Sequence, residues 1–74
     1  SIEEQGDEFL LMGLRLTEGI DPGRFYALAG KALAPSRVAD LISHGLVEYT
    51  REGRLRVSAE GFPILDSVVA DLAA

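Results

Sequence analysis

The sequence predicts a small, mainly α-helical domain with one β-hairpin. Three observations point to this fold class. Three segments with helically spaced apolar residues fill the first 45 positions, two short β-rich runs follow, and a final helical stripe comes last. A chain of 74 residues suffices for a single domain, residues 1–74, with a thin core. The order helix–helix–helix–strand–strand–helix is that of a winged helix, with helices two and three as the helix-turn-helix and the hairpin as the wing.

The first helix is expected to begin at about Glu3 or Asp7, because residues 1–7 have the composition of a frayed entry. Acidic side chains suit the first turn of a helix. The helix should run to Leu16, and Gly19 can close it.

This helix is apolar on two sides. At 100° per residue its apolar side chains form two groups: Phe9, Met12 and Leu16 on one face, Leu10, Leu11 and Leu14 on roughly the opposite one. A helix with two apolar faces is buried on two sides. The second face is covered either by the last helix or the hairpin, or by a missing domain or a second copy of the chain.

The next two helices have clear start and stop signals. Asp21 followed by Pro22 is typical of an N-cap with proline at the first helical position, and Gly30 ends that helix. Residues 34–36, Ala-Pro-Ser, open the third helix, which Gly45 ends.

After this point the apolar period changes. Residues 46–50 and 54–57 are two short β-rich runs, and Arg-Glu-Gly at 51–53 is a turn between them, so the pair predicts a hairpin. Ser58 is expected to cap a last helix, whose start Pro63 should delay or kink. The buried stripe of this helix is expected to be Leu65, Val68, Val69 and Leu72.

Four stretches carry a family resemblance: DEFLLMGLRLTEGID at 7–21, the F..L.G pattern at 25–30, L...GLVE at 41–48 and GRLRVSAEG at 53–61. Together they resemble the C-terminal domain of the oxygen-independent coproporphyrinogen III oxidase-like radical SAM proteins. Among these, the sequence is most similar to the heme chaperones of the HemW type. The pair Phe62-Pro63 departs from the family, which more often continues helically there.

The resemblance implies a parent protein with an upstream radical SAM barrel, which binds a 4Fe–4S cluster and S-adenosylmethionine and in some members heme. The parent would act in porphyrin metabolism, either as an oxidase that decarboxylates coproporphyrinogen propionates or as a chaperone that transfers heme. The present chain would be an accessory domain that packs on the barrel. Its start at serine and not methionine fits a fragment of a longer protein.

Within this picture the expected interdomain interface consists of Leu10, Leu11, Leu14 and Arg15. Arg15 has two interpretations. It forms an ion pair at the edge of the core, or it recognises a carboxylate, either a porphyrin propionate or an acidic side chain of the barrel.

Composition argues against an active site in this chain. There is no cysteine, and the single histidine, His44, is placed to cap the third helix. We therefore expect no catalytic, cofactor-binding or metal-binding residue here. No apolar run is long enough to span a membrane, and we expect a cytoplasmic location.

The main alternative is a stand-alone winged-helix regulator that binds DNA through Arg54 and Arg56 of the hairpin. The formal net charge of −5 and a nearly neutral third helix make nucleic acid a poor partner. A further alternative is a dimerisation module, and an isolated copy of the domain could dimerise through its first helix.

Overall fold

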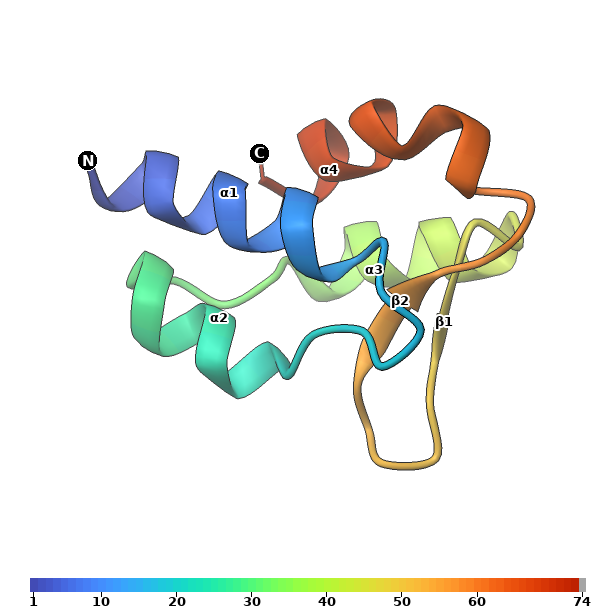
Figure 1. Cartoon of the computed structure of the whole chain (residues 1–74), viewed down its shortest axis with the longest axis horizontal. Helices are drawn as coiled ribbons and strands as arrows, with labels where there is room; N and C mark the ends of the chain where they lie inside the picture. The colour runs from blue at the N-terminus through green and yellow to red at the C-terminus, as the bar shows by residue number, and fades with distance from the viewer. Residues whose placement is uncertain (74) are drawn as a thin grey trace.

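The computed structural model describes residues 1–73, apart from the side chain of Glu3. It confirms a mainly helical chain with one antiparallel hairpin (Figure 1). The elements are α1 (Ile2–Gly13), α2 (Pro22–Ala29), α3 (Pro35–Ser43), β1 (Val47–Tyr49), β2 (Leu55–Val57), the short 3-10 helix η1 (Phe62–Ile64) and α4 (Leu65–Ala73).

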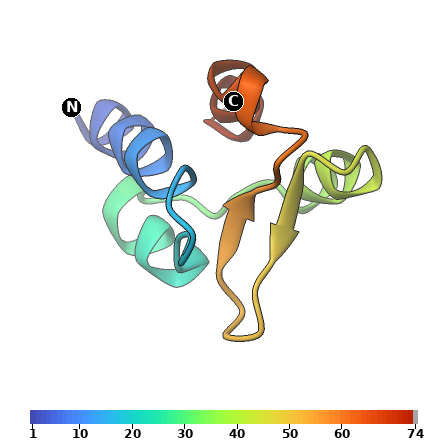
Figure 2. The ribbon, with the colours of Figure 1, turned by 45° about the vertical axis from the view of Figure 1, so that its right-hand side comes forward.

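The helices surround the base of the hairpin. Helix α1 packs against α2 on one side and α4 on the other, and α3 packs against α4 and β1. Figure 2 shows the hairpin between the α1–α2 pair and α3, with its turn pointing away from α4. None of the described helices has the length and the apolar run that a bilayer crossing requires.

One core connects the four α-helices and the hairpin. Its largest fully buried side chains come from α1 and the residue that follows it, and from α2, β2 and α4: Leu10, Leu14, Phe25, Leu55 and Val68. Full burial of such a side chain stabilises a fold by about 1.5–3 kcal/mol. The last helix contributes Val68, Val69 and Leu72, as its apolar spacing predicts, while Leu65 is only partly buried.

The start of α1 differs from the expectation. Residues 1–7 are not a frayed entry, because Ser1 caps the helix and Ile2 is its first residue. The Ser1 hydroxyl accepts a hydrogen bond from the Glu4 amide at 3.2 Å. A serine that satisfies an otherwise unpaired amide in this way is a strong helix start.

The end of α1 also differs, since the helix stops at Gly13 and not at Leu16. The carbonyl of Leu14 accepts a hydrogen bond from the Val57 amide at 3.0 Å, so it is bonded to the second strand of the hairpin. The helix end therefore depends on a hydrogen bond to a residue far along the chain, and the sequence near residue 14 does not predict this bond.

The caps of the middle helices are as expected. The Asp21 carboxylate accepts a hydrogen bond from the Gly23 amide at 2.9 Å, with Pro22 at the start of α2. Gly30 closes that helix with φ 76°, and Gly45 follows α3 with φ 73°. Both angles lie in the left-handed region, where glycine has no steric penalty.

The hairpin has the predicted turn, between strands that lie within the two predicted runs. Val47 pairs with Val57, and Tyr49 with Leu55. Leu55 also bridges Ile20, with two backbone hydrogen bonds of 2.8 Å. Gly19 does not close α1 as expected. With φ 73°, it turns the chain into this bridge and packs against the Leu55 backbone, where no Cβ fits.

The final helix starts late, as Pro63 predicts, because η1 precedes α4. Ser58 does not cap α4, however. Its hydroxyl donates to the Gly45 carbonyl and accepts from the Gly61 amide at 3.2 Å, so it fixes the turn before η1. Ser58 lies seven residues before Leu65, the first residue of α4, and is therefore too far along the chain to cap this helix.

Candidate functional site

An open apolar groove runs along α1, between this helix, α2 and the loop of residues 14–21. We call it the α1–α2 groove; its volume is about 700 Å³. Apolar residues that line it are Phe9, Met12, Leu16, Ile20 and Leu28. Met12 and Leu16 keep 62% and 51% of their surface exposed, so the groove is a water-facing apolar surface and not part of the core.

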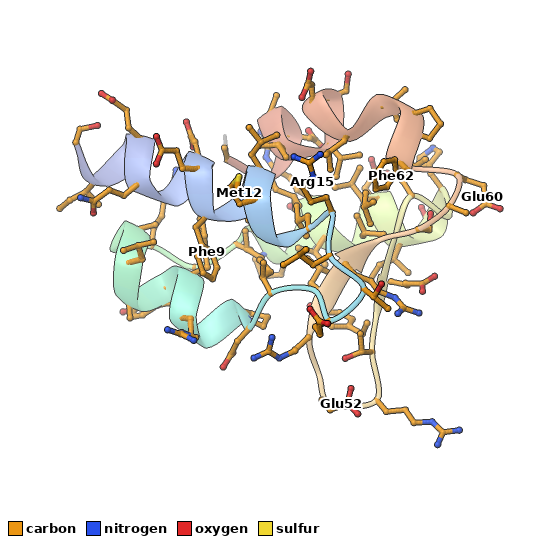
Figure 3. All side chains as sticks on the ribbon, in the orientation of Figure 1. Phe9, Met12, Arg15, Glu52, Glu60 and Phe62 are labelled. Atoms are coloured by element: carbon orange, nitrogen blue, oxygen red, sulfur yellow. The ribbon has the colours of Figure 1, made fainter. Side chains whose placement is uncertain are left out.

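Close contact between α1 and α2 forms one end of the groove. A Cβ on Gly6 would lie 2.9 Å from the Ala29 Cβ, so only glycine allows this helix spacing without a shift. Next to this contact, the rings of Phe9 and Phe25 lie with their centroids 6.5 Å apart and tilted by 36°. In Figure 3, Phe9 points from α1 toward α2.

The other end of the groove depends on Gly13. A Cβ at this position would overlap the side chain of Ile20, which is buried beside it. Glycine there has a helix propensity about 1 kcal/mol worse than alanine. The close approach of Ile20 explains why the chain tolerates this weakness and lets the loop turn back over α1.

The rim of the groove carries charge of both signs. Glu8, Arg15, Arg24 and Arg54 line it, and among the described side chains none of the four forms an ion pair. Arg54 donates to the Gly19 carbonyl at 3.4 Å, which holds its guanidinium at the loop. The ion pair expected for Arg15 at the core edge is not formed with any described residue.

The structure corrects half of the expected interface. Leu10 and Leu14 have no exposed surface, because α2, α4 and the hairpin enclose this side of α1. They cannot contact another domain in this fold. Leu11 remains 38% exposed and Arg15 is exposed, so both are available for such a contact.

The sequence did not identify Met12 and Leu16 as surface residues, because its apolar spacing predicts two faces without indicating which one the domain covers. Phe9, on the same face, is partly buried against the core. The positions of two glycines do indicate which side of α1 is covered. Gly6 and Gly13 lie seven residues apart, on the side of α1 next to Leu10, where other elements approach most closely.

His44 is the C-cap of α3, as expected. Its Nδ1 lies 2.8 Å from the Asp40 carbonyl oxygen and 3.7 Å from the Asp40 carboxylate. A side chain at this point can hydrogen-bond to the carbonyl groups that the last turn of a helix leaves unpaired.

The hairpin arginines make contacts within the domain. Arg56 binds the Glu48 carboxylate through Nε at 2.7 Å and Nη2 at 2.6 Å, and its Nη1 donates to the Thr17 carbonyl at 3.0 Å. Arg54 reaches the same loop. The hydrogen bonds from Arg54 and Arg56 thus connect the hairpin to the loop of residues 14–21. They do not favour the DNA-binding alternative, which depends on Arg54 and Arg56.

Comparison with protein families identifies the chain. A model described as the HemN C-terminal domain matches residues 1–64, that is α1 through η1. The chain belongs to the HemN C-terminal domain family. Neither a curated protein nor a solved structure matched the chain.

HemN-like radical SAM proteins carry this domain at their C-terminal end, so membership implies a parent with an N-terminal radical SAM domain, a 4Fe–4S cluster and S-adenosylmethionine. The residues of this chain do not fit the cluster. Iron–sulfur clusters are held by cysteine thiolates, and the 74 residues include no cysteine. Among the described residues, no group of histidine and carboxylate side chains is arranged to hold a metal ion either.

Proposed function

We propose that this chain is a winged-helix accessory domain that packs on the radical SAM barrel of its parent, a cytoplasmic protein of porphyrin metabolism. The α1–α2 groove is the observation that carries the proposal. An apolar surface that stays open after the domain has folded is typical of a site where another protein surface binds.

The chemistry of the groove supports a protein surface as the occupant. Met12 is flexible and polarisable and adapts to irregular neighbours. Phe9 and Leu28 provide further apolar area. The rim charges Glu8 and Arg15 can form ion pairs that fix the register of the contact. In the parent, Arg15 would bind a carboxylate of the barrel, or a porphyrin propionate where the domain edge meets the substrate.

The proposed role is one of shape and not of chemistry. The domain would cover part of the barrel and help to define the site there, while the barrel supplies the catalytic or chaperone activity. The proposed packing role would be the same whether the parent is an oxidase or a heme chaperone.

The test is binding in trans between this chain and the barrel of the parent, expressed without its C-terminal domain, by titration calorimetry. We expect binding of the unaltered chain, and weakening by roughly tenfold or more in Met12→Glu, because a charge would be buried in the groove. Phe62→Glu is the matched control. Phe62 is also an exposed apolar residue, at 51%, but it lies on η1, outside the groove (Figure 3).

Absence of binding by the unaltered chain would contradict the proposal. Loss of binding in Phe62→Glu but not in Met12→Glu would place the contact on another face of the domain.

A further inference from the structure

We propose that a second copy of this chain covers the α1–α2 groove when no barrel occupies it. The two α1 helices would lie antiparallel about a two-fold axis near Leu11 and Met12. This inference stands without the proposed function, because it concerns the chain by itself and its test needs no barrel.

The apolar part of such a contact is in place. Leu11 and Met12 of α1 and Leu16 in the following loop are exposed by 38%, 62% and 51%. Met12 and Leu16 line the groove, and Leu11 is the neighbour of Met12 on the exposed side of α1. Burial of these side chains against their own copies removes apolar surface from water, which is the main driving force of association. The surface is small, so we expect a weak dimer.

The charges beside this strip select a second copy. Glu8 and Arg15 are seven residues apart, which is about 10 Å along a helix, too far for them to pair with each other. Arg15 follows the end of α1, but Leu14 retains helical backbone angles of −65° and −26°, so the helical path continues to it. Neither side chain has an ion-pair partner among the described residues.

The midpoint between Glu8 and Arg15 falls between Leu11 and Met12. Antiparallel packing about this point sets Glu8 of each copy opposite Arg15 of the other, which forms two equivalent ion pairs. This is the reciprocal pattern that a two-fold interface requires. Parallel packing would instead oppose like charges at both ends, and such contacts are unfavourable.

The first experiment is sedimentation velocity over a concentration series at low salt. We expect reversible dimerisation. Reversal of one charge, in Glu8→Arg or in Arg15→Glu, should raise the dissociation constant by roughly tenfold or more, because each copy then meets two like-charge contacts. The double variant Glu8→Arg with Arg15→Glu exchanges the two charges and should restore the dissociation constant to within about threefold.

The matched control is Glu52→Arg in the wing turn, which reverses a charge far from the groove (Figure 3) and should leave the dimer unchanged. A chain that remains monomeric at about 1 mM would overturn the inference. So would a dimer that all of these charge variants leave unaffected, since it would use another face.

A second experiment uses the absence of cysteine from the sequence. Met12→Cys introduces one thiol beside the proposed two-fold axis, so oxidation should link two copies efficiently. Glu60→Cys, in the turn before η1, should not. Equal linking of both variants would overturn the antiparallel arrangement. Added barrel should compete with the dimer; a dimer without barrel binding would remove the proposed function and leave this inference standing.

Discussion

The two faces of α1 are equally apolar, but the fold treats them in opposite ways. On the inner face, Leu10 and Leu14 are fully buried. On the outer face, Met12 and Leu16 are more than half exposed. Two glycines of α1 contribute to the difference: Gly6 admits Ala29 of α2 on the inner side, and Gly13 admits Ile20 where the inner face meets the groove.

This contrast separates two uses of apolar side chains. The inner face holds the domain together, and its loss should appear in the free energy of unfolding. The outer face contributes little to the isolated fold, and its loss should appear in association with another protein surface. Substitutions on the two faces can therefore test the comparison directly.

The largest effect is expected for Leu10→Ala, which leaves a cavity in the core. We expect the free energy of unfolding to fall by about 3 kcal/mol, a large fraction of the stability of a small domain. Urea denaturation measures it. Leu11→Ala, at the next position but on the exposed side, should cost about 1 kcal/mol or less. Equal losses would break the comparison of the two faces.

An intermediate effect is expected for Gly13→Ala. Helix propensity alone would make this change stabilising by about 1 kcal/mol, but the new methyl group overlaps Ile20. Overpacking in a close contact costs about 1–3 kcal/mol, so we expect a net loss of about 1 kcal/mol. A double-mutant cycle with Ile20→Ala, followed by urea denaturation, should show the loss to depend on the Ile20 side chain. An additive result would mean that the approach of Ile20 is not the reason for glycine here.

The smallest effect on stability is expected for Leu16→Ser on the outer face. Because this side chain is half exposed, the free energy of unfolding should change by no more than about 0.5 kcal/mol. The same variant should weaken self-association, measured by sedimentation. A loss of stability comparable to that of Leu10→Ala would show that the groove belongs to the core.

Much of the fold follows from local signals in the sequence. Each of these signals affects only the few residues around it. The structure confirms the start of α2 at Asp21 and Pro22, the helix ends at Gly30 and Gly45, and the late start of the last helix at Pro63. The end of α1 could not be predicted in this way, because it depends on a hydrogen bond between Leu14 and Val57, 43 positions along the chain.

The candidate site was predictable only in part. Periodicity shows that α1 has two apolar faces, and one face does remain open. Which face remains open is decided by α2, α4 and the hairpin, so the leucines at 10 and 14 were assigned to the wrong side. Arg15 and Leu11 keep their assignment to the exposed surface.

The family match ends before the last helix, but the hydrophobic core includes that helix. The match covers residues 1–64, but Val68, Val69 and Leu72 of α4 belong to the same core as Leu10 and Leu14. Arg37 and Asp71 join α3 to this last helix through an ion pair of 2.9 Å. A variant truncated after residue 64, where the family match ends, would lack α4, which packs against α1 and helps to bury its inner face. For protein engineering, residues that lie outside the family match are therefore still part of what the fold needs.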